Sequence, residues 1–324
     1  MRNYAHLLDD YEDNDQPRYR KPRKKAAKAP VALADPEVGY QHEFRPTFPP
    51  DPTKHEYQWV VDYLKDFYND QLIADVLHRV KGGKEANVYC CEAHPVTGVD
   101  LLAAKIYRPR EFRSLRNDAV YRQGRRVLGG DGKRVKSDRE LHAVAKGSSY
   151  GKRVAHTSWL AHEYETLQAL YAAGADVPKP WAVGSNAILM EYLGEAGVAA
   201  PTLQETRLAQ HEARPLLDRV IHNLDLMLQQ GRVHGDLSAF NILYWESDIH
   251  LIDFPQVVDI RTNHEAWDIF YRDVERVCQY FDRYGVAPNA HRLATKLWRR
   301  YVPEDDFEKH NLLALAETMD EGED

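Results

Sequence analysis

The sequence predicts an α+β fold in which a small strand-rich part precedes a mainly helical part. Short runs of apolar and β-branched residues, bounded by glycine or polar residues, occupy 80–107 and 187–193 and indicate strands. Apolar residues recur at helical spacing in three longer segments, 158–173, 214–230 and 264–284. With 324 residues, 43% of them hydrophobic, the chain can bury the core of one two-lobed unit.

The N-terminal elements are expected to follow a disordered extension, because residues 1–50 are polar and contain seven prolines. A helix is predicted over about 55–79, with Trp59, Tyr63 and Phe67 along one side. The strands of 80–107 come next.

Glycines mark the ends of two predicted helices. Gly174 follows the helix over 158–173, and Gly231 follows the helix over 214–230. The helix over 264–284 is the last strong one in the sequence, and its apolar positions predict a packed core.

Residues 234–253, HGDLSAFNILYWESDIHLID, hold the most informative motif. Its two β-rich runs are joined by a Glu-Ser pair and predict a hairpin that brings Asn241 close to Asp253. Transfer of a phosphoryl group from ATP needs a carboxylate near the acceptor hydroxyl, a role that Asp236 suits. It also needs oxygen ligands for magnesium, which Asn241 and Asp253 supply. The combination therefore favours phosphotransfer over ordinary turns.

A cation for the phosphates is expected from Lys105, which lies in the apolar strand LLAAKIY (101–107). Lysine is seldom buried without a partner. Glu163 flanks the apolar side of the helix over 158–173, where an acid is costly unless it meets a cation, whereas Glu165 points elsewhere. We expect Glu163 to pair with Lys105; a solvated lysine and a solvated glutamate are the alternatives.

Two further segments suit a nucleotide. The glycines of KGGKEANVY (81–89) let backbone N–H groups approach phosphate oxygens, although the G-x-G-x-x-G pattern is absent and a plain hairpin turn is the alternative. The extended backbone from Met190 to Leu193 could offer adenine an acceptor and a donor, or it could be a plain core strand.

Together these motifs resemble the RIO family of atypical protein kinases. The matching segments are GKEANVY (83–89), AAKIY (103–107), Trp159 with Glu163-Tyr164, MEYLGEAGVAAP (190–201), HGDLSAFNIL (234–243) and IDFPQ (252–256). The resemblance covers about residues 55–286. It implies a bilobal protein-kinase-like fold, with a small β-rich N-lobe and a mainly helical C-lobe, that lacks the usual activation loop and peptide-docking subdomains.

The resemblance favours a type-one-like or bacterial-type member of the family. IDFPQ is typical of the type-two branch, but type-two members carry an N-terminal winged helix, and residues 1–50 are too polar for one. Two positions depart from protein kinases generally. Ser238 stands where many kinases have lysine, and Pro255 replaces the last glycine of Asp-Phe-Gly. One cation fewer near the γ-phosphate predicts slow turnover on peptides.

The resemblance also implies residue roles. Asp236 is the expected catalytic residue, Asn241 and Asp253 the metal ligands, and Asp253 also a transient phosphate acceptor, which would make the protein partly an ATPase. The implied cofactors are ATP and Mg²⁺, with Mn²⁺ as a substitute. The residues expected to contact the nucleotide are Lys105, Glu163, Gly82, Gly83, Lys84, Glu85, Val88, Met190, Glu191 and Leu193.

The expected organisation is an extension (1–50), an N-lobe with a preceding helix (51–189), a hinge and C-lobe (190–302) and an acidic tail (303–324). The resemblance places a flexible loop at about 108–157, and its glycines agree with that. Three serines there are candidates for autophosphorylation: Ser137, Ser148 and Ser149.

The net charge of −7 conceals basic segments at 18–28 and 105–155. Such segments could bind RNA or a ribosomal partner through counterion release, or simply aid solubility. The three cysteines form no C-x-x-C pair, so we expect core thiols in a reducing cytoplasm. No apolar run approaches the ~18 residues of a membrane span.

The resemblance implies a serine kinase that phosphorylates protein, itself included, and acts in archaea and eukaryotes on small ribosomal subunit maturation. Two alternatives stay open. A small-molecule kinase of the aminoglycoside or choline class shares the motif, but usually has a long acidic helical region after the metal-binding Asp. An RNA- or ribosome-binding scaffold would not need Lys105, Asp236, Asn241 and Asp253 together.

Overall fold

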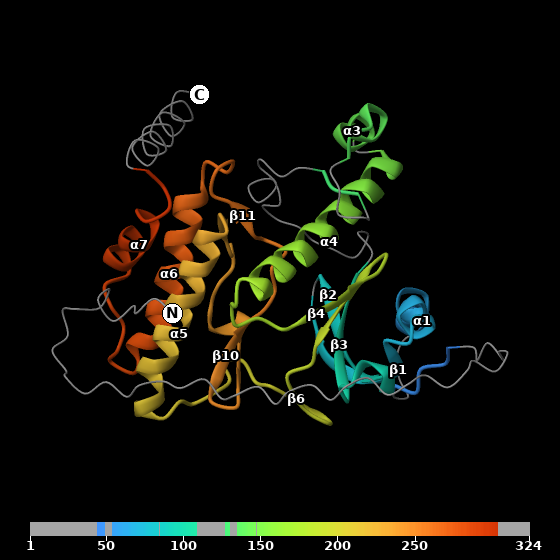
Figure 1. Cartoon of the computed structure of the whole chain (residues 1–324), viewed down its shortest axis with the longest axis horizontal. Coiled ribbons are helices and arrows are strands. Elements are labelled where there is room, and N and C mark those ends of the chain that lie inside the picture. Colours follow the sequence, from blue (N-terminus) through green and yellow to red (C-terminus); the bar gives the residue numbers. More distant parts are fainter. Residues whose placement is uncertain are drawn as a thin grey trace.

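The fold is described from a computed structural model of the chain (Figure 1). It describes residues 44–48, 54–83, 85–108, 127–129, 135–146 and 148–303. Predictions for the basic segment 18–28, for Lys84 and for nearly all of the acidic tail lie outside these residues. The same holds for most of the N-terminal extension and for much of the segment 108–134.

Five antiparallel strands form the sheet of the N-lobe. Their order is β1-β2-β3-β5-β4. The strands span Ile73–Gly82 (β1), Ala86–Ala93 (β2), Leu101–Tyr107 (β3), Pro180–Val183 (β4) and Ala187–Glu191 (β5). β3 lies at the centre and is buried along almost its whole length, which explains its nearly continuous apolar sequence.

The pleat of β3 divides its side chains between two faces of the sheet. Leu102, Ala104 and Ile106 point to one face and belong to a core that also contains Val60 and Leu64 of helix α1 (Lys54–Asn69). Ala103, Lys105 and Tyr107 point to the other face and line a cavity. The single cation of the strand is therefore on the side away from α1.

Helix α1 is shorter than predicted. It ends at Asn69, not near 79, and residues 73–79 open strand β1 instead. Gln71, with φ +56°, reverses the chain between them. The buried side of α1 carries Val60, Leu64 and Phe67, whereas Trp59 and Tyr63, which the helical pattern placed inward, are only partly buried.

Helix α4 (Ser149–Ala172) is longer than predicted, and the expected flexible loop is wrong in its second half. Residues 138–145 form helix α3, and α4 begins nine residues before the predicted start. The Ser148 side chain caps α4 by accepting from the Gly151 N–H. Gly151, one of the presumed loop glycines, lets the two helices touch, because a Cβ there would lie 1.8 Å from the Ala143 carbonyl oxygen.

The C-lobe is mainly helical (Figure 1). Its helices are α5 (Gln210–Gln229), α6 (Ala266–Asp282) and α7 (Ala290–Trp298), and they share one apolar core. The first two correspond to predicted helices, and α7 was not foreseen. Short strand pairs complete the lobe: β6 (Gly194–Glu195) with β7 (Val198–Ala199), and β8 (Arg232–Val233) with β11 (Val258–Asp259).

The predicted hairpin is confirmed. Strands β9 (Ile242–Trp245) and β10 (Asp248–Leu251) pair antiparallel. Glu246 and Ser247 form the two-residue turn, with φ +50° and +61°. A two-residue hairpin turn of type I′ requires a positive φ at both of its central residues.

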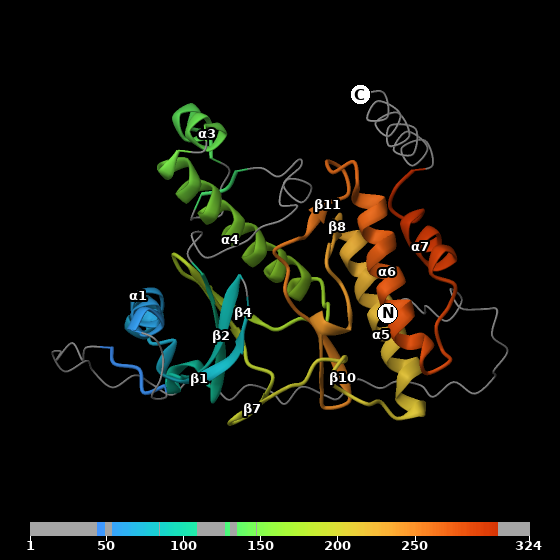
Figure 2. The same cartoon turned by 180° about the vertical axis from the view of Figure 1, so that it is seen from behind.

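The α+β, bilobal protein-kinase-like architecture is confirmed. Seen from both sides, α4 crosses from the sheet toward the helical lobe, while α1 lies on the outer side of the sheet (Figures 1 and 2). The three cysteines are buried free thiols, as expected. Among the described residues, no helix has the length and apolar character that crossing a membrane requires.

Candidate active site

A cavity of about 630 Å³ lies between the sheet and the hairpin of the C-lobe. Its walls come from the inner face of the sheet, from α4, from the connection after β5, and from the loops on either side of the hairpin. The volume is in the range of small-molecule sites. Ten of the predicted nucleotide or metal residues line it, together with Asp236: Gly83, Glu85, Val88, Lys105, Glu163, Met190, Glu191, Leu193, Asn241 and Asp253.

Lys105 is the electrostatic centre of this cavity. Its Nζ lies 2.6 Å from Glu163 Oε1 and 2.6 Å from Asp253 Oδ1. The Tyr107 hydroxyl donates to the other oxygen of Glu163, so that carboxylate is held at both ends. Glu163 is 4% exposed, which a helix glutamate tolerates only with such partners.

The pKa values of Lys105 and Asp253 follow from this pairing. Burial alone would lower the pKa of Lys105, but the charges of Asp253 and Glu163 outweigh it and hold that pKa well above its usual value. Burial would raise the pKa of Asp253, but the Lys105 ammonium lowers it below its ordinary value. Both groups are therefore charged at neutral pH.

The loop that carries Asp236 is held by hydrogen bonds on every side. Asn241 Nδ2 donates to the Asp236 carbonyl oxygen at 2.8 Å and to its Oδ2 at 3.3 Å. The Asp236 N–H donates to His234 Nδ1, so the proton of this buried imidazole is on Nε2, where it donates to the Ile252 carbonyl oxygen at 3.1 Å. Burial lowers the pKa of His234, which keeps the ring neutral.

Asp273 anchors the same loop from below. It lies on α6 with no exposed surface and accepts hydrogen bonds from the backbone N–H groups of Gly235 (2.7 Å) and Leu237 (3.0 Å). Burial raises its pKa to about 7. Asp273 is not among the residues predicted from the sequence, although an acid on the apolar side of a predicted helix is a signal for a buried, hydrogen-bonded carboxyl group.

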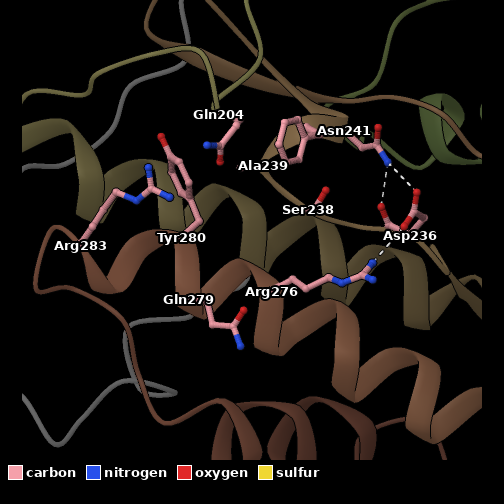
Figure 3. Close-up of a pocket in the computed structure, with 10 residues that line it drawn as sticks. Gln204, Asp236, Ser238, Ala239, Asn241, Arg276, Gln279, Tyr280 and Arg283 are labelled. Carbon is pink, nitrogen blue, oxygen red and sulfur yellow. Dashed lines mark hydrogen bonds and ion pairs between the residues drawn. The ribbon is translucent and has the colours of Figure 1, made fainter. Parts of the chain in front are cut away.

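Arg276, also on α6, was missed as well. Its Nη1 donates to Asp236 Oδ1 at 2.9 Å. The Asp236 carboxylate thus receives a guanidinium from a distant part of the sequence, although Arg276 does not line the nucleotide cavity. Figure 3 shows Arg276 reaching from α6 to Asp236, with Asn241 on the other side of the same carboxylate.

Not every predicted residue lines the cavity. Gly82, the last residue of β1, pairs with Asn87 and is not part of the wall. Conversely, apolar wall residues such as Ala103, Ile188 and Phe254 were not predicted. Ala103 lies two residues before Lys105 in β3, so the two side chains share a face of that strand. Ile188 is the register partner of Lys105 on the neighbouring strand β5.

The chain is similar to known proteins over most of the lobes described above. A family profile described as RIO domain matches residues 102–293, more than half of the chain. The chain belongs to the RIO family.

Several relatives support that membership. The chain is 30% identical over 217 residues to a human serine/threonine-protein kinase RIO1, in an alignment that covers 67% of this chain and 35% of the relative. It is 30% identical over 236 residues to the RIO1 of Chaetomium thermophilum, with coverage of 69% and 42%. It is 29% identical over 206 residues to a RIO-type kinase Rio1 of Haloferax volcanii, with coverage of 64% and 63%.

The RIO profile spans Lys105, Glu163, Asp236 and Asp253 of the cavity. In each of these three relatives the alignment covers less than two thirds of the relative's own length. The RIO1 names agree with the type-one-like interpretation of the sequence.

Proposed function

We propose that this RIO-family protein is an ATP- and magnesium-dependent serine/threonine kinase. The observation that carries the proposal is the pair of 2.6 Å contacts from Lys105 to Glu163 and to Asp253, in a cavity that Asp236 and Asn241 also line. A buried cation between two carboxylates is costly to maintain for stability alone. Next to a ligand-sized cavity, it suits the neutralisation of phosphate charge.

Lys105 would bind the phosphates, with Glu163 holding its ammonium in place. Asp236 would accept the proton of the acceptor hydroxyl, while Arg276 and Asn241 fix the direction of its carboxylate. In the connection after β5, the Glu191 N–H is bonded to the Lys179 carbonyl and the Leu193 carbonyl to the Ala200 N–H. The Leu193 N–H has no backbone acceptor among the described residues, so we assign it as a donor to adenine.

The residues that would hold magnesium are Asn241 and Asp253. The amide nitrogen of Asn241 is used by Asp236, which leaves the Asn241 oxygen for a cation. Within the described part of the chain, no cluster of three or more His, Cys, Asp or Glu side chains could hold a metal. That agrees with magnesium, which is commonly bound by one or two carboxylates together with substrate phosphates. When bound, the ion would neutralise charge that develops on the phosphates.

Two finer activities belong to the same proposal. Asp253 would also accept phosphate transiently, which would give ATPase turnover. Autophosphorylation would occur between molecules, because α3 lies at the end of α4 away from the C-lobe (Figure 1). Of the candidate serines, Ser137 precedes α3 without a side-chain capping bond, whereas the Ser148 hydroxyl accepts from Gly151, so we favour Ser137.

The proposed cellular partners are a protein serine substrate and ribosomal RNA or protein, with a role in small ribosomal subunit maturation. The basic segments 18–28 and 105–155 support RNA binding. A filter-binding series over salt concentration tests this: affinity should fall steeply as salt rises, and an absent slope would remove the RNA partner.

Turnover of γ-labelled ATP with Mg²⁺ tests the main proposal. Wild type, Asp236→Ala and Asp253→Asn are compared for free phosphate and for label on the protein. We expect both variants to lose turnover. Acid-stable label would indicate serine or threonine phosphorylation, and hydroxylamine-labile label an aspartyl phosphate. A wild type that neither binds nor turns over ATP would contradict the proposal.

A further inference from the structure

A second cavity, of about 500 Å³, adjoins Asp236; Figure 3 shows the residues that line it. Asp236 and Asn241 line both cavities. The proposed catalytic carboxylate thus stands in the wall between them. In-line transfer places the acceptor hydroxyl opposite the leaving oxygen across the γ-phosphorus. An acceptor that enters from the second cavity would meet a phosphate held in the nucleotide cavity next to this carboxylate.

The chemistry of the second cavity is cationic and amide-rich. Two guanidinium groups, of Arg276 and Arg283, line it together with the side-chain amides of Gln204 and Gln279. The residues from α6 recur every three or four positions, so the stripe 276–279–280–283 follows one side of that helix. In Figure 3 Arg276 reaches toward Asp236, Tyr280 and Arg283 lie farther along the same side, and Gln279 points away from the loop that carries Asp236 and Ser238.

The two arginines contact different partners. Arg276 is engaged by the Asp236 carboxylate at 2.9 Å. Arg283 stacks on Tyr280, with its guanidinium carbon 4.5 Å from the ring centroid, and no described carboxylate lies within ion-pair distance of it. Tyr280 is itself fixed, because its hydroxyl donates to the Leu203 carbonyl oxygen at 2.8 Å and the residue is 3% exposed.

An aromatic residue completes the lining. Phe240, between Asp236 and Asn241 in sequence, is 58% exposed and presents its ring at this cavity. An exposed aromatic beside a preoriented guanidinium and two amides is a surface that fits an extended peptide. Amides bind its backbone, the ring covers an apolar side chain, and the guanidinium binds a carboxylate.

We propose that this second cavity, bounded by Asp236, Phe240 and Arg283, is the acceptor site and that it selects a peptide with acidic residues next to the phosphorylated hydroxyl. The proposal rests on the kinase activity proposed above. In the reaction, the acceptor oxygen bonds to the γ-phosphorus while the bond to the β-phosphate oxygen breaks. Asp236 takes the hydroxyl proton, and ADP leaves.

The chain itself supplies a peptide for the test. Residues 312–324, LLALAETMDEGED, contain one hydroxyl, that of Thr318, and five acids. The matched control peptide has Gln and Asn in place of these acids. We expect the acidic peptide to have a KM about five- to tenfold lower than the control, the effect of one or two partly exposed charge pairs. Equal KM values would overturn the proposal.

Variants locate the effect. Arg283→Glu should remove the preference for the acidic peptide, and Arg283→Gln should reduce it. Arg299→Glu makes the same charge change at an exposed position just after α7 that does not line the cavity, and it should keep the preference. A preference that survives Arg283→Glu would show that the acids bind elsewhere, and the assignment of the cavity would be wrong.

Binding separates this proposal from the kinase proposal. Fluorescence anisotropy of the labelled acidic peptide, without ATP, should show tighter binding to wild type than to Arg283→Glu, and the difference should shrink with salt. This binding difference would support the peptide site even if no peptide were phosphorylated. An absence of phosphorylation would count against the kinase proposal alone. If the acidic and control peptides bind equally and a single-stranded RNA displaces them, the cavity binds nucleic acid and the inference fails.

Discussion

At the scale of single residues, the site depends on charges that hold each other in place. Lys105 is almost fully buried, yet its pKa is raised, because two carboxylates contribute more than burial removes. Removing one partner of such a group leaves a buried charge without compensation, which destabilises the fold more than replacing both partners by apolar residues.

Lys105→Met is therefore expected to reduce both stability and turnover. Because it leaves Glu163 buried without its cation, the free energy of unfolding should fall by about 3–5 kcal/mol in urea titrations. The double variant Lys105→Met/Glu163→Gln should recover part of that stability but no turnover. A single variant as stable as wild type would mean that the buried pair is not formed in solution.

Arg276 acts on the reaction through Asp236, as a positioning residue. Arg276→Ala should lower kcat by about ten- to a hundredfold through misorientation of the carboxylate, with KM for ATP nearly unchanged. Arg276→Lys should retain more of kcat than Arg276→Ala, because lysine supplies a positive charge but not the planar donor geometry of arginine. Steady-state kinetics check this; a change in KM for ATP alone would contradict the assignment.

At the scale of elements, the loop before the hairpin has a backbone conformation that requires glycine at position 235. Gly235 has φ +84°, and a Cβ there would lie 2.3 Å from the Gln256 carbonyl oxygen. Asp253, at the far side of the hairpin, also has a left-handed backbone, with φ +72°. Left-handed residues at both ends of the motif let the chain turn sharply beside the cavity.

Gly235→Ala should destabilise the protein by about 3 kcal/mol or more, since it combines a left-handed conformation with a backbone clash. Gly285→Ala is the matched control: its φ is +68°, but nothing lies within 4 Å of the added Cβ. That control should cost only about 1 kcal/mol. Urea unfolding of the two variants measures the difference. Equal losses in the free energy of unfolding would mean that Gly235 is not packed against the Gln256 carbonyl oxygen in solution.

The buried Asp273 of α6 gives this loop a pH dependence. Burial raises its pKa from 3.8 to about 7. The folded state then holds a proton that the unfolded state releases above pH 4. Stability from this group is thus greatest below pH 4 and is lost as pH rises toward 7, by about 1.4 kcal/mol per pH unit.

Asp273→Asn should remove that slope. Between pH 5 and 7, the stability of wild type relative to the variant should fall as pH rises, and above pH 8 it should stay constant. Chemical unfolding at a series of pH values checks this. A stability difference between the two proteins that rose with pH would mean that the carboxylate is ionised in the fold.

At the scale of the whole molecule, the two lobes are joined across the cavity by the ion pair between Lys105 of the sheet and Asp253 of the helical lobe. A ligand that binds both residues would bind the folded protein and not the unfolded chain. Such a ligand stabilises the fold in proportion to the logarithm of its concentration.

Mg²⁺ with a non-hydrolysable ATP analogue should therefore raise the melting temperature. At one hundred times Kd the gain is about 2.7 kcal/mol, which corresponds to roughly 4 °C for a protein of this size. EDTA should reduce the shift, and Asp253→Asn should nearly abolish the magnesium-dependent part. Differential scanning fluorimetry measures it; a shift unaffected by EDTA would count against a metal at Asp253.

The sequence by itself determined the elements whose signal is local. The hairpin at 242–251 follows from two β-rich runs and a two-residue turn, and the run 101–107 has the composition of a central strand. The segments of the motif around Asp236, Asn241 and Asp253 stand close in sequence, so their proximity could be predicted without the fold.

The tertiary structure alone decided whatever depends on residues that are distant in sequence. Asp273 and Arg276 reach the loop of Asp236 from α6, about forty residues away, and Arg283, just after α6, lines the adjoining cavity. No spacing rule predicts which side of a helix will meet that loop. The boundary of α1 and the start of α4 were wrong for a related reason. Pairing with β2 turned residues 73–79 into a strand, and packing on α3 made a presumed loop helical, because partners far along the chain outweigh local propensity.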